Sequence, residues 1–455
     1  MGLIGPGIIS LIIFVGVTII ASVGFKRNIA WSMCLAWLAS LLLAGRNIPS
    51  YAVESLKAGL INEVMYPSIC FCFMAEMMRR TGIIKRLVTI LNSIFGRIPG
   101  GAGYVSTMAS ALMGAVSGSG SGNAAVSGSI TIPWMMESGF SDQLATTIVT
   151  GNATLGMSIP PSTSMFLMLA MPAIAGKCEA GALYVACLCG GMYVLAYRLL
   201  TVFYYTKRYK IRAVDRSSLL PLSEALRTGW KSLLIFFGVF IPLALTSGPV
   251  SEWLSAGPFG EDGVGSIDMM IWIPTLLVLI TVLEGRKYLP KITEVKKWRE
   301  IIVGDIMSYP AVGGTIIFSF AGSEVMTRLG LGAEMEAIFA NLSSMPALVT
   351  IMVVGVILLI LAGPLNSTGT LVTMGSVGFV ALTSVGLRPA TALTIMLLFA
   401  ATEGCVPPAS TPLVIASGIS GLKDPSKCFK DLMFIYTTGS FVIATLVGVG
   451  ILPIL

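Results

Sequence analysis

Apolar runs of about 20 residues recur along the whole chain, and no other feature restricts its fold as strongly. A run of that length crosses the hydrocarbon core of a bilayer as a helix, which satisfies its own backbone hydrogen bonds. Only 11% of the 455 residues are charged, against about 25% in soluble domains. So few charges cannot cover a soluble surface. The sequence therefore predicts an all-α polytopic membrane protein.

Several classes of function are excluded by what the sequence lacks. The chain has no His, which removes histidine bases and histidine metal ligands. It has no P-loop of the GxxxxGK[ST] type, so a fused ATP motor is not expected. Its eight Cys form no CxxC pairs. An intramembrane enzyme would also need a nucleophile with a base, or a metal cluster, and the apolar runs hold neither.

The positions of the basic residues predict how the chain is threaded. Of the 29 Lys and Arg, 24 fall in alternate connectors or, for Arg198, at the end of an apolar run. The positive-inside rule puts these connectors in the cytoplasm and both termini outside, in the periplasm. This alternation of cytoplasmic and outside connectors is consistent only if two apolar stretches, near residues 101–136 and 346–384, do not cross the membrane. Each of them would enter and leave on the same side as a re-entrant hairpin. Ten spans remain: Leu3–Gly24, Ala30–Ala44, Asn62–Met78, Gln143–Ile174, Gly181–Tyr205, Ser232–Ser247, Met269–Leu283, Asp305–Met326, Pro389–Gly418 and Leu432–Pro453.

The two halves of the sequence align with a shift of 247 or 248 residues. The shift matches the double proline Pro160–Pro161 to Pro407–Pro408, Gly139 to Gly386, and Glu76 and Arg80 to Glu324 and Arg328. Because the charges thread the two halves in opposite directions, we expect inverted repeats. The predicted division is scaffold helices at 1–61, a first repeat at 62–205, connecting helices and basic loops at 206–304, and a second repeat at 305–455. Each repeat contains a hairpin, at 101–136 or 346–384, and a broken helix, at 143–174 or 389–418.

Helix-breaking residues inside these apolar segments mark the candidate site. The stretch at 114–128, GAVSGSGSGNAAVSG, is a poor helix, and at 363–370 the sequence is GPLNSTGT. Irregular backbone inside a membrane is tolerated only where protein buries it or where it lines a cavity. Each double proline must interrupt its helix as well. An interruption exposes carbonyls that suit a cation and amides that suit a carboxylate.

One acidic residue, Glu403, lies deep in an apolar run at the position that matches Gly156 of the first half. Buried carboxylates in membranes usually act at ion or proton sites. Three roles are open for Glu403: a cation ligand, a proton carrier, or a partner of an internal hydrogen-bond donor.

With SGSGSGN at 117–123, ITIP at 130–133 and LGMSIPPS at 155–162, the chain resembles the DctM-like large membrane subunit of tripartite ATP-independent periplasmic (TRAP) transporters. The resemblance implies an elevator-type secondary transporter in the bacterial inner membrane, driven by Na⁺. It also implies a periplasmic protein that delivers organic acids and a separate four-helix membrane subunit. It assigns a first Na⁺ site to Ser117, Gly156, Ile159 and Pro161. The family's second site uses glycine and threonine positions that here hold Glu403 and Val406, which puts that site in question.

The prediction is a Na⁺-coupled permease that imports a small organic anion. The predicted cation ligands are Ser117, Gly156, Ile159, Pro161, Gly363, Glu403 and Val406. The predicted substrate contacts are Ser119, Asn123, Ser162, Thr163, Asn366, Ser367, Thr368, Ser410 and Thr411. The main alternative is a self-sufficient ion-coupled symporter or antiporter for organic anions, in the wider ion-transporter superfamily. A channel is disfavoured, because paired hairpins in inverted repeats favour alternating access.

Overall fold

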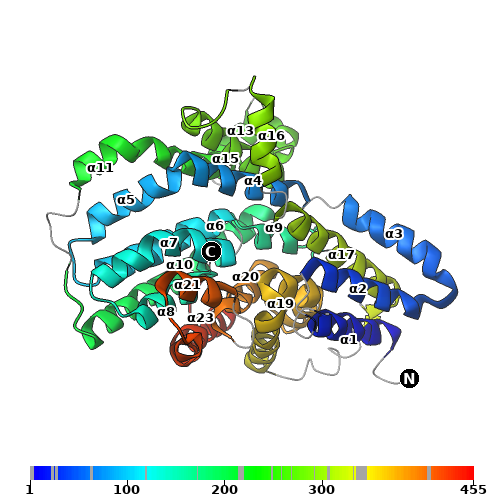
Figure 1. The fold of residues 1–455 in the computed structure, drawn as a ribbon. Helices are drawn as coiled ribbons and strands as arrows, with labels where there is room; N and C mark the ends of the chain where they lie inside the picture. Colours follow the sequence, from blue (N-terminus) through cyan, green and yellow to red (C-terminus); the bar gives the residue numbers. More distant parts are fainter. Residues whose placement is uncertain are drawn as a thin grey trace.

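The computed structural model describes residues 5–454 except 22–24, 26–28, 62–64, 118–119, 172, 214–219, 247–248, 258, 268, 292, 305–307, 332, 335–345 and 407–410. Within that part of the chain the fold consists of helices and their connections, without a strand. Figure 1 shows the helices stacked in layers, with the N-terminal helices at one end of the molecule. The all-helical prediction is confirmed.

The N-terminal helices pack on a helix of the second half. They are α1 (Pro6–Ile19), α2 (Ile29–Leu41), the short η2 (Leu42–Asn47) and α3 (Ile48–Leu60), and they pack with α17 (Ser308–Arg328). A buried cluster that includes Phe14, Trp37 and Val325 holds this group together. The carboxylate of Glu334 accepts the amides of Gly7 and Ile8 at 3.1 and 2.8 Å, and so caps the positive end of α1.

The first half continues with a helical hairpin and a broken helix. Its elements are α4 (Met65–Thr81), α5 (Ile83–Phe95), α6 (Gly101–Ser117), α7 (Gly120–Glu137), α8 (Asp142–Asn152), η3 (Leu155–Ser158), α9 (Thr163–Leu169) and α10 (Ala180–Arg208). Helices α6 and α7 are antiparallel, because the hydroxyls of Ser106 and Thr131 lie 3.0 Å apart and those of Ser110 and Ser127 lie 3.2 Å apart. This register puts the turn between the end of α6 and the start of α7.

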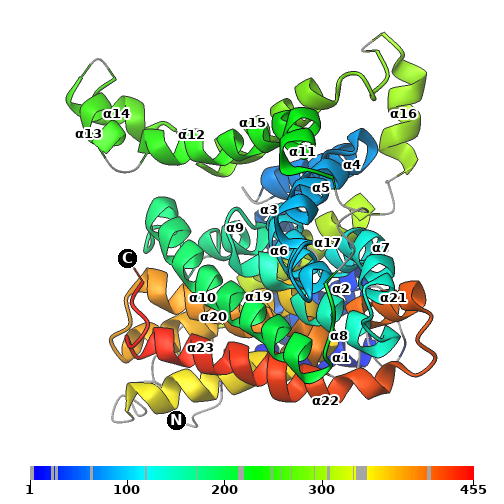
Figure 2. The same cartoon turned by 90° about the vertical axis from the view of Figure 1, so that its left-hand side faces the viewer.

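An arm of helices connects the halves. It comprises α11 (Leu222–Gly229), η5 (Trp230–Phe236), α12 (Phe237–Thr246), α13 (Pro249–Ala256), α14 (Gly260–Gly265), α15 (Met269–Gly285) and α16 (Val295–Gly304). Figure 2 shows it along one edge, with α13 and α14 far from the other helices. Arg86 of α5 anchors the arm by donating to both carboxylate oxygens of Glu284, at 2.7 and 2.8 Å. Large apolar side chains such as Phe240, Ile271 and Trp272 are exposed on it, as expected of the predicted spans Ser232–Ser247 and Met269–Leu283.

The second half contains α19 (Ala347–Ser384), which folds back on itself. Its residues are helical on both sides of residue 366, and a Cβ at Gly378 would lie 3.4 Å from the Cγ1 of Val354. A straight helix would separate these positions by about 36 Å. The contact is centred on residue 366, so α19 is a hairpin too. The half continues with α20 (Pro389–Ala400), η6 (Glu403–Cys405), α21 (Thr411–Ser420), η7 (Pro425–Cys428), α22 (Phe429–Asp431), η8 (Leu432–Thr437) and α23 (Thr438–Gly448).

Positions that align in the sequence have the same local geometry in the two halves. Gly139 and Gly386 both turn the chain into the next helix with φ of 90°, a left-handed conformation that favours glycine. Arg80 pairs with Glu76 at the end of α4, and Arg328 pairs with Glu324 one turn apart at the end of α17. The hairpin turns of α6–α7 and of α19 are separated by the same shift that aligns the two sequences.

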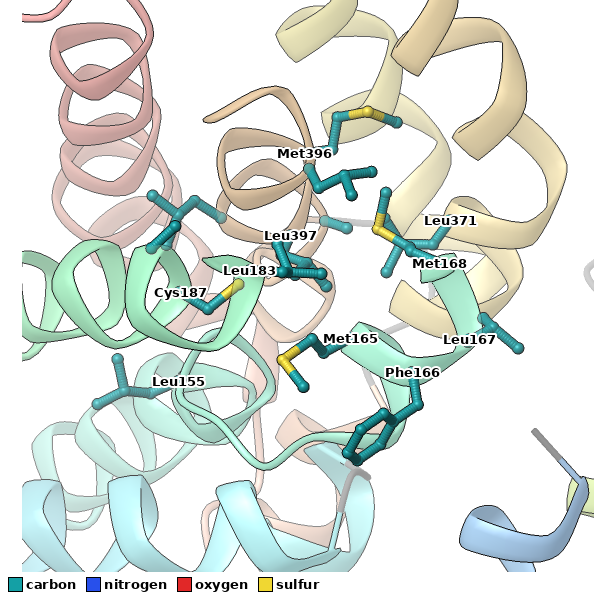
Figure 3. Packing of buried hydrophobic residues seen from close by; sticks show 14 of the residues in the cluster. Leu155, Met165, Phe166, Leu167, Met168, Leu183, Cys187, Leu371, Met396 and Leu397 are labelled. Atoms are coloured by element: carbon teal, nitrogen blue, oxygen red, sulfur yellow. The ribbon is translucent and has the colours of Figure 1, made fainter. Parts of the chain in front are cut away.

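The largest buried cluster joins the two halves. Figure 3 shows Met165 and Met168 of α9 beside Leu183 of α10, Leu371 of α19 and Met396 of α20. Flexible methionine side chains fill the irregular space that short helices leave between them. The core therefore lies around the broken helices and holds their interruptions in place.

By length and composition, two helices of the described part can cross a membrane: Ala180–Arg208 and Pro425–Gly448. The bent pair Leu222–Phe236 and Phe240–Thr246 makes a third if it is one span. Several of the ten predicted spans are interrupted in the structure, as in the predicted span Gln143–Ile174, where α8 and α9 are separated by η3 and an extended segment. The count of ten spans stays a prediction.

Candidate functional site

Two hairpin turns and two helix breaks converge in the middle of the molecule. Thr154, at the first break, donates its hydroxyl to the carbonyl of Ala401, at the second. A Cβ added to Gly120, at the start of α7, would lie 2.6 Å from the Cγ2 of Thr154 and 3.8 Å from the Oε2 of Glu403. Glu403 in turn contacts Ser367 of α19. The four irregular segments thus share one small region, as the sequence predicts for its candidate site.

The first break has the geometry that its prolines impose. Helix α8 ends at Asn152, η3 follows, and Ile159 is extended at φ −107° and ψ 120°. Ser162 restarts the helix, because its hydroxyl accepts the amide of Met165 and donates to the carbonyl of Met157 at 2.8 Å. Gly156, Ile159 and Pro161 all lie in this break, where the carbonyl of Gly156 accepts the amide of Ile159 at 3.1 Å.

The second break repeats this path with a carboxylate added. Val406, the mate of Ile159, is extended at φ −114° and ψ 126°. Glu403 lies in η6 and is only 7% exposed. Its Oε2 accepts the backbone amide of Ser367 at 2.9 Å and lies 3.0 Å from the Ser367 hydroxyl. The amide is that of a residue in the hairpin turn, so Glu403 links the broken helix to the hairpin.

The Ser367 hydroxyl has one proton and two oxygen neighbours. Its oxygen lies 2.7 Å from the carbonyl oxygen of Ala400 and 3.0 Å from the Oε2 of Glu403. One proton cannot serve both contacts. A proton on Glu403, or a cation among the three oxygens, would satisfy the second contact. Among the described residues Glu403 has no basic partner. The third role expected for it, pairing with an internal donor, is therefore observed, and the other two roles stay open.

Asn123 joins the first hairpin to the first break. Its Nδ2 donates to the carbonyls of Ser110, at 2.9 Å, and Ala153, at 2.7 Å, and the side chain is fully buried. Its Oδ1 has no hydrogen-bond partner within the described residues. In this conformation the Asn123 amide serves packing between segments, and its predicted role as a substrate contact stays a prediction.

The carbonyls at the two helix ends fit a hard cation chemically. Those of Ala153, Ala400 and Ala401 each accept a hydrogen bond from a side chain: Asn123, Ser367 and Thr154, respectively. Such carbonyls, hydroxyls and a carboxylate are the oxygen ligands that Na⁺ takes at broken helices. The described residues contain no cluster of three or more His, Cys, Asp or Glu, the ligand set of a transition metal.

The remaining predicted site residues are placed as follows. Thr163 and Thr411 are the first residues of α9 and α21, half-buried and exposed, respectively, and Thr368 is half-buried in the turn of α19. Ser119 and Ser410 lie outside the described residues. Ser117, Gly363 and Asn366 belong to described helices, but their surroundings are not described.

The observed position of Arg198 differs from the one that the sequence indicates. The sequence places Arg198 at the end of an apolar run, whereas in the structure its side chain is 1% exposed inside α10. Its guanidinium lies 4.4 Å from the centre of the Tyr436 ring and donates to the Ser440 hydroxyl at 2.8 Å. Its Nε and Nη1 have no partner among the described residues. Lys207 and Arg208 lie in the last turn of α10, whereas Arg198 lies ten residues before the end of this helix. That position is the only sequence signal that distinguishes Arg198 from the other two.

Comparison with known proteins points to one family. Residues 12–453 match the model of the tripartite ATP-independent periplasmic transporter, DctM component. The C4-dicarboxylate TRAP transporter large permease protein DctM of Pseudomonas aeruginosa is 32% identical over 38% of this chain and 41% of its own length. The isethionate TRAP transporter permease protein DctMQ of Oleidesulfovibrio alaskensis is 24% identical over 92% of this chain and 60% of its own length.

The uncharacterized protein YgiK of Salmonella typhimurium is 29% identical over 51% of this chain, which spans about half of that relative's length (54%). Among solved structures, the YdaH transporter of Alcanivorax borkumensis has a TM-score of 0.59 at 13% identity, covering 89% of this chain and 88% of its own. The MtrF efflux pump of Neisseria gonorrhoeae has a TM-score of 0.61 at 14% identity, covering 89% and 83%. At such identities these two likenesses show a common fold and nothing about substrate.

Proposed function

The chain belongs to the DctM family of tripartite ATP-independent periplasmic transporters, and from this premise we propose that it is the large permease subunit of a secondary transporter that imports a small organic anion. The observation that carries the proposal is the convergence of two hairpin turns and two helix breaks around Glu403. Broken helices whose ends meet in the interior are the sites at which secondary transporters bind ions and substrates.

We propose that Na⁺ is the coupling ion. The carbonyls at the ends of α8 and α20 supply the oxygens in our proposal, together with the Ser367 hydroxyl and Glu403. The amides at the starts of α9 and α21 would hold the carboxylate of the substrate. Coupling follows if the substrate prefers the cation-loaded state, because a ligand shifts an equilibrium only by its differential affinity.

Glu403 adds a second possibility within the same site. A protonated Glu403 can donate to the Ser367 hydroxyl when that hydroxyl donates to Ala400, and an ionised one can bind a cation. Whether protonated or ionised, Glu403 stands at a position where the second Na⁺ site of the family has a neutral residue. We propose that it carries part of the coupling in this permease.

The partners follow from the family. We propose a separate small membrane subunit and a periplasmic binding protein that delivers the anion, with the permease in the bacterial inner membrane and both termini periplasmic. The two aligned halves, with hairpins whose turns match by the alignment shift, support two structural repeats. We propose that these repeats are inverted, as the distribution of Lys and Arg indicates, and that they move as an elevator.

Uptake into proteoliposomes tests the proposal. The permease is reconstituted with its small subunit, and the binding protein is added outside with radiolabelled C4-dicarboxylates, isethionate or ectoine, substrates for which relatives are named. We expect accumulation of one class of anion that requires an inward Na⁺ gradient. Uptake that persists without Na⁺ would refute Na⁺ coupling. Uptake without the binding protein would favour a self-sufficient symporter.

A further inference from the structure

Thr154 links the two breaks directly. It follows the end of α8, is fully buried, and donates its hydroxyl across the molecule to the carbonyl of Ala401 at the end of α20. On its other side its methyl group contacts the α7 end of the first hairpin, since a Cβ at Gly120 would lie 2.6 Å from it. One side chain therefore touches both repeats.

The backbone around Thr154 is equally close. A Cβ at Gly404 would lie 2.9 Å from the carbonyl oxygen of Thr150, so η6 rests against α8 without a side chain between them. Ala401, which accepts from Thr154, directly follows Ala400, whose carbonyl accepts from Ser367. Thr154 and Ser367 thus hold the carbonyls of two consecutive residues, two and three positions before Glu403.

The second half has a buried threonine next to Ala401, the residue that the shift of 247 matches to Thr154, and this Thr402 makes a different bond. Thr402 has nearly the same backbone, φ −103° and ψ 4° against −97° and 0° for Thr154. Its hydroxyl donates to the carbonyl of Phe399, within its own helix end, at 2.8 Å. Two buried threonines with nearly the same backbone conformation therefore differ in one respect: the hydroxyl of Thr154 crosses between the repeats, and that of Thr402 does not.

We propose that Thr154 is a positioning residue that couples the two helix breaks, so that a ligand bound at one changes the affinity of the other. A coupling of this kind needs a physical contact between the two sites, and the Thr154–Ala401 bond is such a contact. When a cation draws the Ala401 carbonyl away, the hydroxyl of Thr154 is released and the first break relaxes. The transport consequence rests on the proposed function, whereas the mechanical link does not.

The link is tested without Na⁺ by amide hydrogen exchange on the assembled complex. Thr154→Val keeps the shape and removes the donor, so we expect exchange to rise about threefold to tenfold in peptides covering residues 399–406 of the other repeat. Thr402→Val, the matched control, should raise exchange only in its own repeat. A rise confined to the first repeat in Thr154→Val would overturn the link. Thr154→Ala serves if the valine variant does not assemble.

The transport role is tested by the Na⁺ dependence of uptake in the same variants. We expect the Hill coefficient for Na⁺ to fall from about two in the wild type towards about one in Thr154→Val. Thr154→Ser should restore it, because the hydroxyl is kept. If the wild type itself ignores Na⁺, the proposed function fails while the exchange result still decides the link. An unchanged Hill coefficient with intact Na⁺ dependence would overturn the role of Thr154.

Discussion

At the scale of single residues, the site depends on hydroxyls and amides that hold helix-end carbonyls. Asn123, Thr154 and Ser367 each donate to such a carbonyl, and Glu403 accepts the amide of Ser367. These donors occupy the oxygens that a cation would take. In the proposed function, loading the site exchanges these hydrogen bonds for ion contacts, so variants of these residues should change ion dependence more than overall shape.

Glu403→Gln should change the coupling of transport. Glutamine keeps the acceptor for the Ser367 amide but loses the charge and the ability to release a proton. We expect the Na⁺ concentration for half-maximal uptake, or the pH profile, to shift by about tenfold or one pH unit. The measurement is uptake against Na⁺ and pH, with expression as the reference. Glu324→Gln, which removes a half-exposed carboxylate paired with Arg328, is the control and should leave both dependences unchanged. An unaltered profile in Glu403→Gln would reduce this residue to a structural role.

Asn123→Asp should destabilise the protein in a pH-dependent manner. An aspartate would face the carbonyls of Ser110 and Ala153 without a proton to donate, leaving buried acceptors opposed at a cost of about 2 kcal/mol or more. Protonation gives one donor back, so stability should rise as the pH falls. Thermal unfolding of the purified complex at several pH values measures this.

Asn152→Asp provides the matched control for that substitution. Asn152 is also fully buried, but its Nδ2 donates to the hydroxyl of Thr107, whose proton can turn from the carbonyl of Gly103 to a carboxylate at the cost of that one bond. We expect a smaller loss in Asn152→Asp and a weaker dependence on pH. Equal losses at the two positions would contradict the structural role given to Asn123.

At the scale of elements, the breaks were predictable from sequence and their contacts were not. Paired prolines forbid a continuous helix wherever they occur, so Pro160–Pro161 identifies an interruption without a structure. The pairing of Glu403 with Ser367 joins segments 36 residues apart, and no local pattern encodes it. The sequence placed Arg198 at the end of an apolar run, where an Arg usually reaches solvent. In the structure its guanidinium is buried over the Tyr436 ring and donates to the Ser440 hydroxyl.

The fold-back of α19 makes a prediction about cross-linking. Val354→Cys with Gly378→Cys should form a disulfide under mild oxidation, because a Cβ at Gly378 would lie 3.4 Å from the Cγ1 of Val354, the atom that the cysteine sulfur replaces. The terminal methyl of Met396 can move aside for the new side chain. Mass spectrometry of the oxidised protein detects the bridge, and Gly378→Ala controls for stability. A folded double variant that stays reduced would mean that α19 does not turn back near residue 366.

At the scale of the whole molecule, the two halves present the same elements around one interior. The ends of α8 and α20 meet, and the largest core cluster includes side chains from both halves. The aligned Glu–Arg pairs end α4 and α17 alike. Local geometry alone does not say whether the halves run the same way through the membrane. The distribution of Lys and Arg carries that information, since basic connectors stay in the cytoplasm.

Exposed residues that are related by the alignment shift should therefore be accessible to a reagent from opposite sides of the membrane. Lys85 and Ala333 are related by the alignment shift of 248 residues and are both exposed. In intact cells a membrane-impermeant maleimide should label Ala333→Cys, whereas Lys85→Cys should react only after the membrane is opened. Lys57→Cys and Lys287→Cys, also exposed, are the outer and inner references. If Lys85→Cys and Ala333→Cys react from the same side, the repeats are parallel, and the alternating access expected of an inverted pair loses its structural basis.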